Sequence, residues 1–92
     1  MAIGVLSQVE GVTPDLYDQV NAKLGDDLPE GNTFHATGFA GSKMVIFDVW
    51  ESREQLERWE NEVLRPAIQE VAGDNAPTPE QDVFELHDLQ QS

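Results

Sequence analysis

The dipeptide Gly41-Ser42 is the sequence feature that most constrains how this chain can fold. It separates two stretches with strand-like composition, residues 33–40 and 43–50. A two-residue loop with glycine in its first position is typical of a type II′ β-hairpin turn. Because so short a turn leaves no freedom in the pairing, it also predicts which residues of the two strands lie opposite each other.

The predicted register places His35 opposite Asp48 and Thr37 opposite Ile46. Side chains alternate across a strand, so the hairpin has two distinct faces. One face is wholly apolar, and we expect it to pack against helices; it carries Phe34, Ala36, Gly38, Val45, Phe47 and Val49. The other face is amphipathic, and we expect a partner subunit to cover it; it carries His35, Thr37, Phe39, Met44, Ile46, Asp48 and Trp50.

Capping signals delimit two helices on either side of this hairpin. Thr13 and the following proline suit the start of a helix over residues 14–24, and Gly25 suits its end. The second helix follows Ser52, which forms a capping-box pattern with Gln55. Pro66 falls inside this second helical pattern and should kink or divide it, because proline removes a backbone hydrogen bond.

Two further strands complete the predicted order. Residues 3–9 alternate between apolar and other side chains, and residues 83–89 are predicted as the last strand. The resulting strand–helix–strand–strand–helix–strand order predicts a single α+β domain over residues 1–92 with the ferredoxin-like βαββαβ fold. Its sheet would be four-stranded and antiparallel, with both helices on one face.

Composition excludes several classes of function. The chain has no cysteine, which rules out disulfides, thiolate metal sites and cysteine nucleophiles. Its formal net charge of −13 disfavours nucleic acid and anionic membrane surfaces as partners. A solvated acidic surface, adaptation to a salt-rich cytoplasm and nucleic-acid mimicry all remain open explanations of this charge. With no basic, apolar leader segment visible, we expect a cytoplasmic protein.

The opposed pair His35 and Asp48 is the candidate catalytic site. A carboxylate beside an imidazole fixes its tautomer and raises its pKa, which is the arrangement of a base with an orienting partner. The alternatives are a polar pair that satisfies itself inside a dimer interface, or a ligand contact without chemistry. We expect Trp50, Thr37 and Phe39 to contact a ligand in the same pocket, although Trp50 also suits simple packing.

Other candidate sites are weaker. His87 is the only other histidine, and its place near the end of the chain suits an exposed side chain. Because no cluster of ligands surrounds it, we expect no metal site. The scattered glycines match no phosphate-binding motif, so we expect no bound cofactor.

The segment from Asp48 to Trp59 resembles the antibiotic biosynthesis monooxygenase-like family of the dimeric α+β barrel group. The resemblance rests on a third strand that ends in Trp50, followed by the helix start Glu51-Ser52-Arg53-Glu54 and by Leu56 on the inner helical face. It implies a homodimer with sheets packed face to face and a pocket in each subunit. Some members of that family oxidise polycyclic aromatic substrates with oxygen and no bound cofactor, and others degrade haem.

The sequence departs from the haem-degrading pattern. Those members use an asparagine on the first strand, a strand tryptophan and a helix histidine, and only Trp50 matches. Two functions therefore stay open. The protein binds or oxidises a small organic molecule in a pocket near His35, or it is a non-catalytic dimeric module with a structural or regulatory role.

Overall fold

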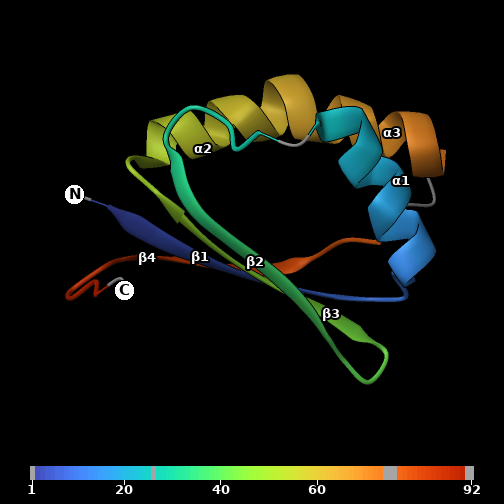
Figure 1. Cartoon of the computed structure of the whole chain (residues 1–92), viewed down its shortest axis with the longest axis horizontal. Helices are drawn as coiled ribbons and strands as arrows, with labels where there is room; N and C mark the ends of the chain where they lie inside the picture. Colours follow the sequence, from blue (N-terminus) through green and yellow to red (C-terminus); the bar gives the residue numbers. More distant parts are fainter. Residues whose placement is uncertain (1, 26, 74–76, 91–92) are drawn as a thin grey trace.

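The chain forms a four-stranded antiparallel sheet with a layer of helices over one of its faces (Figure 1). The computed structural model describes residues 2–25, 27–73 and 77–90. The strands lie in the order β2-β3-β1-β4 and are β1 (Ile3–Glu10), β2 (Asn32–Ala40), β3 (Lys43–Trp50) and β4 (Glu80–Glu85). The helical segments are α1 (Pro14–Leu24), α2 (Arg53–Trp59), the π-helical turn η1 (Glu60–Leu64) and α3 (Arg65–Ala72). This arrangement confirms the predicted α+β, ferredoxin-like fold.

The hairpin between β2 and β3 has the predicted register. Ala40 pairs with Lys43, and His35 pairs with Asp48. Gly41 has a φ of +65°, and no described non-glycine residue has a positive φ, so the turn is of type II′ as predicted. The register shifts only at the far end of β2, between Asn32 and Phe34.

The two faces of the sheet are reversed relative to the prediction. The face that carries His35 and Asp48 lies under the helices, whereas the wholly apolar face points away from them. Phe34 on that outer face is 41% exposed. The prediction was wrong because hydrophobicity cannot distinguish a face covered by helices from one left open for another contact. Here the polar side chains border a cavity, which gives them space and partners that a tightly packed layer would not.

Side chains cap both helical starts as predicted. The Thr13 hydroxyl accepts a hydrogen bond from the Leu16 N–H at 3.1 Å, and the Ser52 hydroxyl accepts one from the Gln55 N–H at 3.2 Å. Each bond satisfies an N–H that has no partner within its helix. Pro66 does divide the second helix, because η1 ends and α3 begins just before it. Proline has no N–H to donate and its ring crowds the preceding turn, so the hydrogen-bond pattern changes there.

The hydrophobic core lies at one end of the space between the layers, where α2 covers the start of β1 and the end of β3 (Figure 1). Its buried members are Ile3, Val5, Trp50 and Leu56, and the partly buried Trp59 and Val83 pack against them. The Trp50 and Trp59 rings lie 5.5 Å apart at 41°. Full burial of one such side chain contributes about 1.5–3 kcal/mol. The core therefore holds α2 to the sheet and leaves the rest of the interlayer space for a cavity.

The last strand differs from its predicted bounds. It runs over Glu80–Glu85 rather than residues 83–89, because its partners on β1 extend from Gln8 to Ile3 and no further. His87 consequently lies beyond the strand and is exposed, as expected for that histidine. Within the described ranges, no helix is long and apolar enough to cross a membrane.

Candidate functional site

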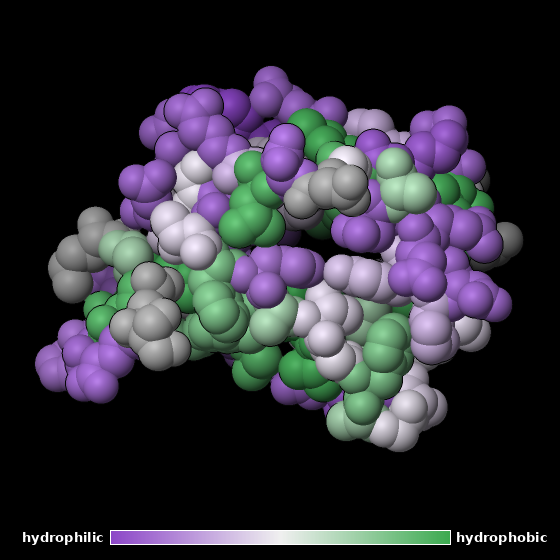
Figure 2. Space-filling view, in the orientation of Figure 1, coloured by the Kyte–Doolittle hydropathy of each residue, from purple (hydrophilic) through white to green (hydrophobic). Residues whose placement is uncertain are grey.

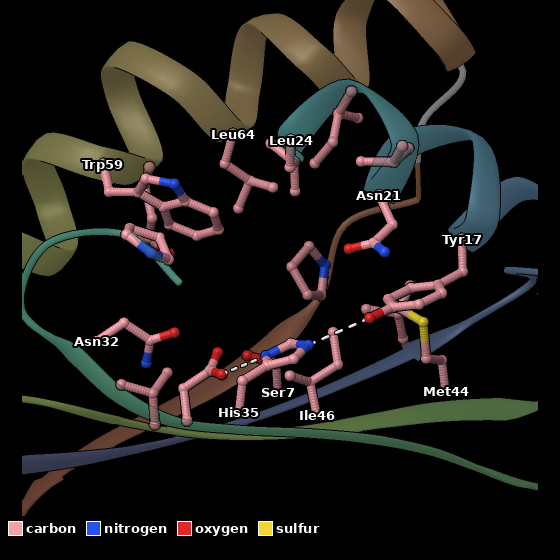
Figure 3. Close-up of a pocket in the computed structure, with 18 of the residues that line it drawn as sticks. Ser7, Tyr17, Asn21, Leu24, Asn32, His35, Met44, Ile46, Trp59 and Leu64 are labelled. Atoms are coloured by element: carbon pink, nitrogen blue, oxygen red, sulfur yellow. Dashed lines mark hydrogen bonds and ion pairs between the residues drawn. The ribbon is translucent and has the colours of Figure 1, made fainter. Parts of the chain in front are cut away.

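A cavity of about 390 Å³ lies between the sheet and the helices (Figure 3). Side chains of β1, β2 and β3 form its floor, and side chains of α1, α2, η1 and α3 form its walls and roof. In the space-filling view the molecule is hollowed between the helix layer and the sheet (Figure 2). Volumes of this size are typical of small-molecule pockets, which are mostly apolar with a few placed polar groups. This cavity has that character.

His35 and Asp48 are joined by a short hydrogen bond on the cavity floor. The Nδ1 atom of His35 lies 2.5 Å from the Oδ1 atom of Asp48, so the predicted contact is confirmed. Their side chains are 33% and 15% exposed, respectively. The hydrogen bond to Asp48 raises the pKa of His35 above its ordinary value of 6.5, burial opposes this shift, and the charge of Asp48 reinforces it. The pair therefore favours a proton on the imidazole.

The other ring nitrogen of His35 faces two hydroxyl groups. The Nε2 atom lies 3.1 Å from the Tyr17 hydroxyl oxygen and 3.1 Å from the Thr37 hydroxyl oxygen. The Thr37 hydroxyl also donates to the Tyr17 hydroxyl at 3.1 Å. Because Nδ1–H donates to Asp48, neutral His35 presents Nε2 as a proton acceptor. Asp48, His35 and the two hydroxyls thus form one continuous hydrogen-bonded chain, part of which Figure 3 shows.

Sequence reasoning missed Tyr17, which comes from α1 on the opposite layer. Its position on the apolar stripe of that helix suggested simple packing, and a phenol ring does suit an apolar wall. The signal that could have found it is chemical, since a buried phenol hydroxyl needs a hydrogen-bond partner. Only the packing of α1 over β2 shows that this partner is His35.

A second group of polar side chains, also missed from the sequence, borders the cavity. Buried Asn32 donates through Nδ2 to the backbone oxygen of Val49 at 2.8 Å, which ties down the irregular start of β2. The Gln81 side chain donates to Ser7 Oγ at 3.5 Å and to Glu60 Oε2 at 3.0 Å. Glu60 opens the π-helical turn η1, a type of distortion that is frequent at functional sites.

The three predicted ligand-contacting residues have different positions. Trp50 lines the cavity but is only 1% exposed, and its indole N–H has no hydrogen-bond partner in the described part of the chain. Thr37 is half-buried and acts through its contact with His35 Nε2. Phe39 lies near the hairpin turn, is 42% exposed and is not part of the cavity lining. The structure therefore brings Trp50 and Thr37 to the site and leaves Phe39 outside it.

The groups present can accept a proton, donate hydrogen bonds and enclose an apolar ring system. Among the described residues, no three histidine or carboxylate side chains come together in a way that could hold a metal ion. The hydrogen-bonded chain from Asp48 to Tyr17 is therefore a candidate for proton transfer at this site.

Comparisons with known proteins show the same architecture elsewhere. No family model and no curated protein matches this sequence. Solved structures do match, and one is a mutant form of SnoaB, a cofactor-independent oxygenase from Streptomyces nogalater, with a TM-score of 0.69 and 12% identity over 99% of this chain and 98% of that one. The chain has the fold of antibiotic biosynthesis monooxygenase-like proteins. The predicted resemblance is therefore confirmed at the level of the fold.

Two further structures share this fold. An antibiotic biosynthesis monooxygenase-like protein from Chloroflexus aurantiacus has a TM-score of 0.63 and 12% identity, with 99% of this chain and 98% of that chain covered. A conserved protein from Methanosarcina mazei has a TM-score of 0.61 and 14% identity, with 92% of each chain covered. At such identities the likeness concerns the fold and says nothing by itself about substrate.

Proposed function

We propose that the cavity binds a small organic molecule and that His35, oriented by Asp48, accepts a proton from it during oxidation by molecular oxygen. The observation that carries this proposal is the 2.5 Å hydrogen bond between His35 and Asp48 on the floor of a cavity of about 390 Å³. A base is useful for catalysis when its pKa lies near the working pH and when it can reach the substrate proton. The hydrogen bond to Asp48 raises the pKa of His35 above 6.5, and the His35 side chain lines the cavity that would hold the substrate.

The proposed reaction needs no group beyond the chain, the substrate and oxygen. A CH₂ group between aromatic rings and opposite a ring carbonyl is acidic, because its anion spreads charge onto the carbonyl oxygen. After His35 takes the proton, the electron-rich anion reacts with oxygen. The CH₂ becomes C=O and the second oxygen atom leaves as water, so atoms and electrons balance. The imidazole returns the proton as that water forms.

We also propose that the protein acts as a homodimer through the outer face of the sheet. Phe34 and Phe84 on this face are 41% and 42% exposed, and the Phe34 ring packs against the Phe47 ring at 6.0 Å. In Figure 2 hydrophobic residues lie along the sheet while hydrophilic residues cover the helix layer. An apolar sheet face on so small and acidic a chain suits a second copy of the same face.

Anthrone is a tricyclic aromatic ketone that carries such a CH₂ group. Measuring oxygen uptake with anthrone as the substrate tests the catalytic proposal. We expect the wild-type protein to accelerate oxygen consumption over the uncatalysed reaction and Asp48→Asn to lose most of this acceleration. Asp18→Asn is the matched control, because Asp18 is an exposed aspartate on α1 that does not line the cavity and lies on the helix layer, away from the proposed dimer face. Binding of anthrone without any acceleration would favour the non-catalytic module instead.

A further inference from the structure

We infer that the cavity selects its ligand by charge, admitting neutral and cationic aromatic molecules and rejecting carboxylates. This inference rests on the proposed function, because it concerns the ligand of the same cavity. It starts from the charged side chains that line the cavity among the described residues, which are His35 and three carboxylates, Asp27, Asp48 and Glu60. The described part of the lining contains no lysine or arginine.

The basic residues of the chain lie elsewhere. There are five lysines and arginines in the sequence, and all five fall within the described ranges. Lys23 binds Glu70 at 2.7 Å and Arg58 binds Glu54 at 2.9 Å, both on exposed surface. Lys43 contacts Gln8, and Arg53 and Arg65 are exposed. A ligand carboxylate would therefore lose water inside the cavity without meeting a lysine or arginine.

His35 does not change this conclusion. Its Nδ1 already binds Asp48, and its Nε2 faces the hydroxyls of Tyr17 and Thr37. A ligand carboxylate at Nε2 would place a second negative charge next to one imidazolium, so two carboxylates would share a single positive charge. The pair of His35 and Asp48 is thus close to neutral when His35 is protonated and negative when it is not.

Glu60 supplies a negative charge to the cavity lining that no cation offsets among the described residues. Its Oε2 accepts a hydrogen bond from Gln81, which carries no charge. Glu60 takes part in none of the ion pairs formed among the residues that the structure describes. The formal net charge of −13 adds a negative field over the whole molecule, and low-dielectric walls concentrate such a field inside a cavity. Together these charges favour an amidinium or amine over a carboxylate of the same shape.

Three flat two-ring molecules of nearly identical shape test the inference: 2-naphthoate, 2-naphthamide and 2-naphthamidine. Both tryptophans of the chain line the cavity, so the two indole N–H signals in ¹⁵N-labelled protein report binding at this place. At low salt we expect the dissociation constant of the naphthoate to be at least ~10-fold higher than that of the naphthamide. The naphthamidine should bind at least as tightly as the naphthamide.

Glu60→Gln is the decisive variant, and Glu62→Gln is its matched control. Both remove one negative charge from η1, but Glu62 is exposed and does not line the cavity. We expect Glu60→Gln to lower the ratio of the naphthoate dissociation constant to the naphthamide dissociation constant by about threefold. Glu62→Gln should leave this ratio nearly unchanged. Equal effects of the two variants would show that the net charge of the protein, and not the charges lining the cavity, selects between the ligands. That result would overturn the inference.

The remaining outcomes separate this inference from the proposed function. If the naphthoate binds as tightly as the naphthamide, selection by charge is wrong while the cavity remains a ligand site. If none of the three molecules shifts the indole signals, the cavity is not a site for aromatic ligands, and both the inference and the proposed function are overturned.

Discussion

The imidazole of His35 and the carboxylate of Asp48 face each other across β2 and β3, with Nδ1 and Oδ1 2.5 Å apart. Two rigid strands hold this contact, and the two-residue turn at Gly41-Ser42 sets their register. A site built on paired strands keeps its geometry better than one carried by loops. The pair is therefore positioned before any ligand arrives.

Replacing Asp48 with asparagine should lower the pKa of His35. The hydrogen bond to Asp48 is the largest cause of the raised pKa. In the variant, burial of the imidazole still lowers the pKa, while the contribution of the Asp48 carboxylate that raised it is lost. Titration of the His35 ring protons by NMR measures the shift. Asp82→Asn, which changes an exposed aspartate on the opposite face of the sheet, should leave the His35 pKa unchanged. An unchanged pKa in the Asp48 variant would mean that the contact is absent in solution.

The same pair should make the stability of the protein depend on pH. The folded-state pKa of His35 is raised above the unfolded value, so its stabilising contribution is fully present below pH 6.5 and is lost as the pH rises through the folded pKa. We expect Asp48→Asn to lower the free energy of unfolding by about 1–2 kcal/mol below pH 6.5, since the His35 side chain is partly exposed to solvent. Urea unfolding of the wild type and of Asp48→Asn should show a smaller difference in the free energy of unfolding at ~pH 9. A difference that grows with pH would contradict this sign.

The hydroxyls of Tyr17 and Thr37 should make coupled contributions to the free energy of unfolding. Both contact His35 Nε2 and each other, at 3.1 Å in every case. The single variants Tyr17→Phe and Thr37→Val should each lower the free energy of unfolding by about 1 kcal/mol. The double variant should cost less than their sum, because the first change already removes their shared bond. Urea unfolding of the four proteins gives the coupling energy, and strict additivity would show that the shared bond contributes nothing.

A charge on the outer face of the sheet should separate the proposed dimer. We expect light scattering to give twice the 10.2 kDa chain mass for the wild type and a mass near 10.2 kDa for Phe34→Asp. Val63→Asp is the control, because Val63 on η1 is 42% exposed and Phe34 is 41% exposed, yet only Phe34 lies on the sheet. A wild-type mass of 10.2 kDa at both physiological and high salt would rule out this dimer.

Salt should stabilise the fold. The chain carries 18 acidic residues against five lysines and arginines, and these like charges repel one another in the folded state. Salt screens this repulsion, and the Debye screening length falls from ~10 Å at 0.1 M ionic strength to ~3 Å at 1 M. We therefore expect the melting temperature to rise between low salt and molar KCl. A melting temperature that stays constant or falls would show that the acidic residues do not limit stability.

Local signals in the sequence were sufficient to predict the register of the hairpin and the positions where the helices begin and divide. The turn at Gly41-Ser42 predicted the pairing of His35 with Asp48, because a two-residue loop allows only one register. Thr13 and Ser52 predicted where the helices begin, and Pro66 predicted where the second one divides. Each of these features depends on residues close together in the chain or joined by a short turn.

The tertiary structure decided which face of the sheet the helices cover and which side chains meet there. Both faces of the hairpin carry apolar residues, so hydrophobicity could not assign them, and the more apolar face with Phe34 lies outward. Tyr17 reaches His35, and Glu60 joins the cavity, only because α1 and η1 pack over the sheet. A sequence pattern specifies local geometry through a few neighbouring residues, whereas a cavity depends on how separate layers fit together.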